Sequence, residues 1–216
     1  MQREIDEQLY VQRYENRFDR DTQHLVFDTM TDRIDDPDFA LIQAMAGGDV
    51  SALNELYTRH GASILNYLTS ILHDRELAEE VLQDVMLASW EHAASFRGES
   101  KVRTWLLTIA RHRAINTQRR ITPDLVELDE SALSADTTPL EKVERKSQRQ
   151  NLQAAIQQLP PFHQEILVLI FYHQLSGPEV AEVLGITVGT VKSRLHRAKE
   201  MLRRVLQSMG ENTNAQ

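Results

Sequence analysis

Residues 176–200 read SGPEVAEVLGITVGTVKSRLHRAKE, and this stretch predicts two short helices joined by a tight turn. Ser176 and Glu179 have the spacing of a capping box, in which each side chain bonds to the other residue's backbone amide. Gly185 stands where a helix commonly ends in the left-handed conformation. Thr187 can cap the helix that follows. We therefore interpret this stretch as a helix-turn-helix.

The second predicted helix has one apolar face and one basic face. Its apolar positions recur with helical spacing at Val188, Val191, Leu195 and Ala198. Its opposite side carries Lys192, Ser193, Arg194 and Arg197. A helix of this kind can enter the major groove of DNA and reach phosphates and bases. A purely structural helical hairpin at 176–199 is the alternative.

The net charge of −8 is divided unevenly along the chain. Residues 1–40 and residues 121–141 each carry a net charge of −6, whereas residues 97–120 carry +6 and residues 188–206 carry +5. Salt screens charges that lie more than about 8 Å apart, so local patches decide how the chain meets a polyanion. The two basic patches predict two separate contacts with nucleic acid. Two solvated helix faces are the alternative.

The composition excludes several kinds of site. The chain has no Cys, which excludes disulfides and thiolate chemistry and suits a reducing compartment. No apolar run is long enough to span a membrane, and the N-terminus lacks a secretory pattern, so we expect a cytoplasmic protein. His73-Asp74 lacks further metal ligands at suitable spacing, and no nucleophile is paired with a base. We predict no enzyme activity, no cofactor and no metal site.

Apolar residues recur with helical spacing through most of the chain, so we predict an all-α protein. Residues 121–140 interrupt that spacing and are acidic and rich in Ser and Thr, which predicts a flexible linker. The linker separates two small helical domains, at 38–120 and 141–206. An acidic extension at 1–37, with a possible short amphipathic helix, and a tail at 207–216 complete the chain.

Both predicted domains resemble parts of one family. Residues 185–203, GITVGTVKSRLHRAKEMLR, and residues 159–185 before them resemble region 4 of sigma-70 family transcription initiation factors, especially the extracytoplasmic-function (ECF) group. Residues 78–120 resemble region 2 of the same family, including Q-D-V, F-R-G and T-W-L…I-A-R. The resemblance covers 38–120 and 150–206, with both blocks in the family's order. It implies a sigma factor that binds core RNA polymerase, recognises promoters and opens DNA.

The resemblance also implies roles for individual residues. The polymerase clamp helices are expected to dock on Glu80, Gln83, Asp84 and Trp90, and the flap on the second domain. The −10 element is expected to contact Phe96, Arg97, Gly98, Ser100, Lys101, Arg111, Arg113, Asn116, Arg119 and Arg120. The −35 element is expected to contact Thr190, Lys192, Ser193, Arg194 and Arg197.

Three positions depart from the family's usual residues. Many relatives carry Asn at position 112 and Asp at position 116, where this chain has His112 and Asn116. Both lie where the −10 strand is read. The family's usual sequence preference is therefore not carried over to these two positions. Thr187 replaces a frequent Pro and should serve equally well as a cap.

The alternative function is a helix-turn-helix regulator whose first domain is a sensor, although a sensor needs neither F-R-G-E-S nor a basic helix. The family resemblance further implies an anti-sigma factor as a partner. We also expect the acidic extension and linker to keep the free protein off DNA, so that deleting residues 1–36 should raise DNA binding.

Overall fold

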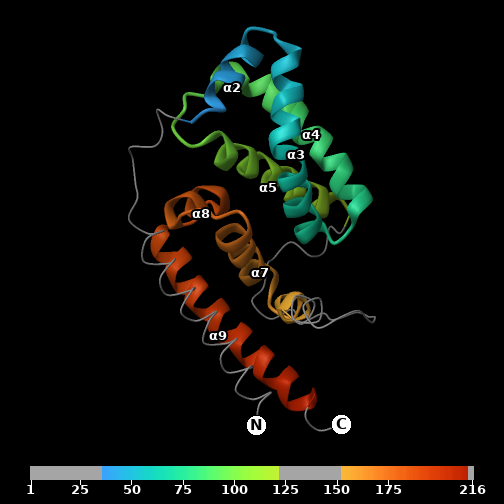
Figure 1. Ribbon diagram of the computed structural model, residues 1–216, viewed down its shortest axis with the longest axis vertical. Coiled ribbons are helices and arrows are strands. Elements are labelled where there is room, and N and C mark those ends of the chain that lie inside the picture. The colour runs from blue at the N-terminus through green and yellow to red at the C-terminus, as the bar shows by residue number, and fades with distance from the viewer. Residues whose placement is uncertain (1–35, 122–151, 214–216) are drawn as a thin grey trace.

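The computed structural model of the protein describes residues 36–121 and 152–213, and within these ranges all regular structure is helical. The first domain consists of α2 (Phe39–Ala46), α3 (Val50–Leu72), α4 (Arg75–His92), the short 3₁₀ turn η1 (Ala93–Ser95) and α5 (Val102–Ile121) (Figure 1). The second domain contains a helical turn at 152–157, α7 (Pro161–Leu167), the π-helical turn η2 (Val168–Tyr172), α8 (Gly177–Leu184) and α9 (Val188–Thr213). The predicted all-α fold is confirmed.

Local capping sets the corners of the first domain. The Asp49 side chain accepts a hydrogen bond from the Ser51 amide at 2.8 Å and so begins α3. His73 ends α3 in the left-handed conformation, with a φ of 55°, and Asp74 caps α4. His73-Asp74 is therefore a helix boundary, and no cluster suited to a metal ion lies within 36–121 or 152–213.

The core of the first domain lies where α3, α4 and α5 meet. Leu56 and Leu68 of α3, Val85 of α4, and Leu106 and Leu107 of α5 are all fully buried. Removing such side chains from water is the main stabilising contribution to a helical bundle of this size. The basic face of α5 is consequently held on a rigid scaffold.

The second domain is built around the helix-turn-helix. Ile166 and Leu169 from the α7–η2 segment pack with Val180 of α8 and Ala198 of α9, and each is fully buried. Helix α9 continues to Thr213, whereas the sequence places the end of this domain at 206. Met209 still packs against the core, which extends the amphipathic face beyond the predicted boundary.

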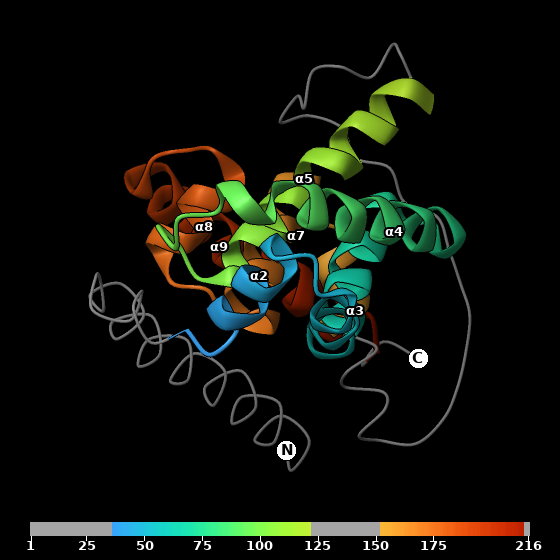
Figure 2. The ribbon, with the colours of Figure 1, turned by 90° about the horizontal axis from the view of Figure 1, so that it is seen from above.

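The two domains pack directly on one another. Helix α5 contacts α8, and α3 contacts α7. In Figure 1 the first domain lies above the second, and seen from above α5 overlies α7 and α8 (Figure 2). The contact joins helices that lie on opposite sides of residues 122–151 in the sequence.

Some predictions concern residues outside the described ranges. These are the short amphipathic helix of the acidic extension, the character of the acidic linker, the start of the second domain at 141–151 and the deletion of the acidic extension. Among the residues that are described, no helix is both long and apolar enough to cross a membrane.

Candidate polymerase and promoter DNA interfaces

The helix-turn-helix forms as its sequence predicts. The Ser176 amide donates to the Glu179 carboxylate at 2.7 Å, and the Glu179 amide donates to the Ser176 hydroxyl at 3.4 Å. Gly185 ends α8 with a φ of 66°, a left-handed conformation that favours glycine. The Thr190 amide donates to the Thr187 hydroxyl at 3.2 Å, so Thr187 caps α9. These contacts set the ends of α8 and the start of α9.

The start of α9 carries the residues that were predicted for the −35 element. Lys192, Ser193 and Arg197 are exposed, while Thr190 is half-buried and bonds to Thr187. Arg194 is also half-buried, and its guanidinium lies over the Phe162 ring, 5.0 Å from the ring centre. This cation–π contact joins the recognition helix to the first turn of α7 and restricts the orientation of Arg194.

The residues predicted for polymerase binding lie along one side of α4. Glu80, Gln83 and Asp84 are exposed and follow the i, i+3, i+4 spacing of a single helix face, whereas Trp90 is half-buried. Leu87 continues this face and is 56% exposed. The sequence analysis missed Leu87. The sequence does contain a signal for it. Leu87 follows Asp84 by three positions and Gln83 by four, so helical spacing places it on the same face and away from the buried positions.

The segment before α5 is an aromatic stack. The Phe96 ring stacks on Trp105 with centres 4.6 Å apart and contacts Phe39 at 5.9 Å. Gly98 has a φ of 67°, and a Cβ atom there would lie 3.0 Å from the Phe39 ring. Ser100 is buried. Three of the residues predicted for the −10 element therefore have a packing role in the folded domain: Phe96, Gly98 and Ser100. Their contribution to DNA binding stays a prediction.

Asp36 is a second residue that sequence reasoning missed. Its carboxylate accepts from the Val102 amide at 2.7 Å, which caps the N-terminus of α5, and from the Asp38 amide at 3.0 Å. The prediction placed Asp36 in the acidic extension, but this residue belongs to the folded domain. Sixty-six positions separate Asp36 from Val102, so no local pattern reveals the bond.

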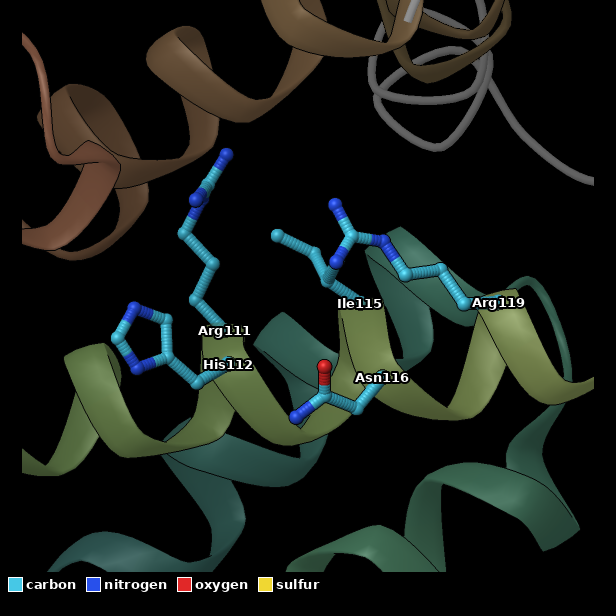
Figure 3. A pocket seen from close by; sticks show the side chains of 5 residues that line it. All are labelled: Arg111, His112, Ile115, Asn116 and Arg119. Carbon is cyan, nitrogen blue, oxygen red and sulfur yellow. The ribbon is translucent and has the colours of Figure 1, made fainter. Parts of the chain in front are cut away.

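The basic face of α5 borders an open pocket of about 400 Å³ (Figure 3). The residues that line it are Arg111, His112, Ile115, Asn116 and Arg119. His112, Asn116, Arg119 and Arg120 are exposed, and Arg113 is half-buried. Arg119 and Arg120 also occupy the last turn of α5, where positive charge offsets the helix dipole.

Two of the predicted −10 residues contact carboxylates of the second domain, although the Lys101 side chain stays 44% exposed. The Arg111 Nε atom donates to the Glu165 carboxylate at 2.9 Å, and Figure 3 shows this side chain extending toward the second domain. The Lys101 ammonium lies 3.7 Å from the Glu179 carboxylate. The hydroxyl of fully buried Tyr67 also donates to Glu165, at 2.8 Å, and burial followed by the Glu165 charge raises the Tyr67 pKa.

Comparison with known proteins identifies the family. Residues 56–122 match the family described as Sigma-70 region 2, and residues 149–202 match the family described as Sigma-70, region 4. RNA polymerase sigma factor YlaC of Bacillus subtilis is 34% identical over 157 residues, which cover 71% of this chain and 91% of that relative. The chain belongs to the sigma-70 family.

Other relatives place it in the ECF group. ECF RNA polymerase sigma factor SigL of Mycobacterium tuberculosis is 31% identical over 174 residues, covering 79% of this chain and 98% of SigL. The solved structure of CnrH in complex with the cytosolic domain of CnrY shares the fold, with a TM-score of 0.60 and 23% identity over 79% of this chain and 97% of that one. RpoE of Bartonella quintana, solved in complex with the anti-sigma factor NepR, shares it with a TM-score of 0.55 and 22% identity over 73% of this chain and 98% of RpoE.

The chain is therefore a sigma factor that directs RNA polymerase to promoters for transcription initiation. The sensor-type regulator is not favoured, because both sigma-70 regions are present in order. Sigma factors are transcription initiation factors and catalyse no covalent step.

Proposed function

We propose that this sigma factor divides its work among three surfaces, on α4, α5 and α9. The observation that carries the proposal is that each surface lies outside the cores and has the charge its ligand requires. The α4 surface combines carboxylates with an apolar side chain, whereas the surfaces on α5 and α9 are basic. A protein partner suits the first surface, and DNA suits the other two.

The α4 surface would bind the clamp helices of the largest polymerase subunit. Glu80 and Asp84 can form charge-assisted hydrogen bonds with arginines of a partner, and Gln83 can bond between them. Leu87 adds an exposed apolar contact of the kind found at the centre of interfaces. Trp90, at the end of the surface, would contribute the exposed part of its ring. The flap of the polymerase would bind the second domain.

The α5 surface would bind the opened strand of the −10 element. Arg113, Arg119 and Arg120 can bind phosphates, while exposed His112 and Asn116 can reach base edges. Phe96, Gly98 and Ser100 shape the segment in front of the helix, and exposed Arg97 extends the positive charge. Unstacking a base costs a few kcal/mol, which these contacts would offset.

The N-terminal half of α9 would bind the −35 element in the major groove. Lys192 and Arg197 are exposed for phosphate contact, and Arg194 is oriented by Phe162 for a base or a phosphate. Ser193 and Thr190 lie on the same part of the helix and can donate hydroxyl hydrogen bonds.

Two features of its setting complete the proposal. The chain would work in the cytoplasm, where RNA polymerase is found. An anti-sigma factor would hold it inactive, by analogy with the solved complexes of CnrH with CnrY and of RpoE with NepR.

Run-off transcription on genomic templates with added core polymerase tests the assignments of α4 and α9. Asp84→Asn should weaken binding to core polymerase, with exposed Glu55→Gln on α3 as the control for the charge change. Arg197→Gln should reduce initiation at promoters with a −35 element, and Arg204→Gln, two turns further along α9, should not. Normal transcription by both Asp84→Asn and Arg197→Gln would refute the assignments.

A further inference from the structure

The segment between η1 and α5 is held by an aromatic ring from the start of the first domain. Phe39, the first residue of α2, places its ring centre 5.9 Å from that of Phe96, with the two rings tilted by 53°. Phe96 in turn stacks on Trp105 of α5, with centres 4.6 Å apart. All three side chains are half-buried. Phe39 is therefore the end of a series of three rings whose middle member is assigned to the −10 strand.

The same ring also limits the turn at Gly98. The Gly98 backbone is left-handed, with a φ of 67°, and a Cβ atom at this position would lie 3.0 Å from the Phe39 Cε2 atom. That distance is shorter than an ordinary van der Waals contact. Glycine is favoured here for two reasons, because it adopts this φ without strain and leaves room for the ring. Phe39 thus contacts the segment 96–101 at two points.

The residue before Phe39 fixes the start of α2 to α3. Asp38 is the N-cap residue of α2, but its side chain makes no capping bond to that helix. Its carboxylate accepts instead from Arg59 Nη1 at 2.6 Å and lies 2.7 Å from His60 Nε2. The Asp38 side chain is only 14% exposed, so these interactions are stronger than they would be in water.

Asp36 fixes the same short segment to α5. One of its carboxylate oxygens accepts from the Val102 amide at 2.7 Å, and the other accepts from the Asp38 amide at 3.0 Å. Val102 is the first residue of α5 and directly follows the segment 96–101. Residues 36–39 therefore contact this segment at Phe96 and also hold the helix that begins at its other end.

Phe39 differs from its neighbours on α2 in what it packs against. Leu41, Ile42 and Met45 all belong to the hydrophobic core of the described residues or pack against it, whereas Phe39 does not. The Phe39 ring is instead directed at Phe96 and Gly98. A residue whose only role was to stabilise the bundle would contact the core, so the placement of this ring favours a role at the segment 96–101.

We propose that Phe39 is a positioning residue for promoter opening, and that its ring holds Phe96 and the Gly98 turn in the arrangement that accepts an unpaired base of the −10 strand. This inference rests on the proposed assignment of the segment 96–101 to that strand. Opening requires that an unstacked base be captured. A segment that is already ordered loses less conformational freedom when the base arrives, so capture is more favourable. Phe39 acts through Phe96 in this scheme and needs no contact of its own with DNA.

The energy of one aromatic contact sets the size of the effect. A tilted pair of rings at this separation shifts an equilibrium by about two- to tenfold. Loss of the Phe39 ring should therefore slow promoter opening by a factor in this range. Binding to core polymerase and to a −35 duplex should not change, because the residues assigned to those surfaces lie on α4 and α9.

Three variants separate positioning from stability. Phe39→Ala removes the ring, and Phe39→Tyr keeps it. Leu41→Ala is the matched control, because Leu41 lies on the same helix but packs against the core. Each full-length variant is combined with core polymerase and a promoter mapped by run-off transcription, with 2-aminopurine in the −10 element. The fluorescence of this base rises when it unstacks, so the rise reports opening.

A second template distinguishes a defect in opening from a general loss of activity. It carries the same promoter with mismatches from the −10 element to the start site, so the strands are already separated. We expect Phe39→Ala to slow the fluorescence rise on the duplex promoter by about two- to tenfold and to transcribe the pre-opened template normally at saturating polymerase. Phe39→Tyr and Leu41→Ala should behave like the unaltered protein on both templates.

Two results would overturn the positioning role. An unchanged rate of opening for Phe39→Ala would show that the ring does not act on the segment. An equal loss on both templates, or the same loss for Leu41→Ala, would show that Phe39 only stabilises the fold, since less folded protein lowers transcription from both templates alike.

A separate arm tests the assignment on which the inference rests. Phe96→Ala and Arg97→Gln alter the segment itself, and each should slow opening of the duplex promoter. If neither does, the segment 96–101 does not bind the strand and the assignment fails. If both do and Phe39→Ala does not, the assignment stands and the positioning role alone is refuted.

Discussion

Lowering the pH should destabilise the protein through one buried side chain, His173. Burial, and after it the charge of Arg103, lower the His173 pKa from its ordinary value of 6.5 to about 4. A guanidinium can only donate, so Nδ1 of His173 accepts and the neutral ring carries its proton on Nε2. The other groups that face the ring are the Ser63 hydroxyl at 3.3 Å and the aromatic rings of Tyr67 and Tyr172.

The sign follows from which state binds the proton. Between pH 6.5 and pH 4, the unfolded chain binds a proton at His173 that the folded chain does not bind. The contribution of neutral His173 is therefore fully present above about pH 6.5 and is lost as the pH falls through about 4. A lowering from 6.5 to about 4 corresponds to about 2.5 kcal/mol of unfolding free energy lost between about pH 7.5 and about pH 4.5.

His173→Asn isolates this contribution. Asn keeps an acceptor for Arg103 but does not titrate, and every other titrating group is common to the two proteins. Urea unfolding of both proteins, followed by circular dichroism across this pH range, should give curves whose difference changes by about 2.5 kcal/mol. Parallel pH profiles, differing in their change by less than about 0.5 kcal/mol, would show that His173 is not held neutral by burial.

Three further results should follow from the described contacts. Phe162→Leu removes the ring beneath Arg194 and should weaken binding to a −35 duplex about two- to fivefold, while Phe162→Tyr should preserve it in the same fluorescence anisotropy titration. Asp36→Ala removes the cap of α5 and should lower the free energy of unfolding by about 1 kcal/mol, whereas Asp84→Asn at an exposed site should leave it unchanged. Arg197→Gln should reduce the salt dependence of duplex binding by about one phosphate contact, and an unaltered slope would exclude Arg197 from the DNA interface.

The sequence predicted those parts of the fold that local chemistry decides. The Ser176–Glu179 capping box, the left-handed Gly185 and the Thr187 cap each depend on residues within four positions, so a linear pattern contains them. The exposed positions of α4 followed from helical spacing for the same reason. Leu87 was missed because the docking residues on this face were taken from the family resemblance, which did not include it, although its register placed it outside the core.

Contacts between distant segments could not be predicted in this way. Asp36 caps a helix that begins 66 positions later, and Glu165 meets Arg111 across 54 positions and two domains. The family resemblance gave Arg111 and Lys101 the same expected role as Arg113. Only the three-dimensional arrangement distinguishes the basic residues that meet carboxylates from those that face solvent.

The two carboxylate oxygens of Glu179 bind different partners, and this affects how mutagenesis of the residue is interpreted. One oxygen holds the start of α8 and the other meets the first domain, so truncation to Ala removes both interactions at once. A scan that scores protein abundance would record Glu179 as a folding residue and conceal its second contact. Such a scan cannot separate the two interactions of a carboxylate whose oxygens bind different partners. Substitutions at Thr104 and Lys101, the partners in the first domain, would measure the second interaction separately.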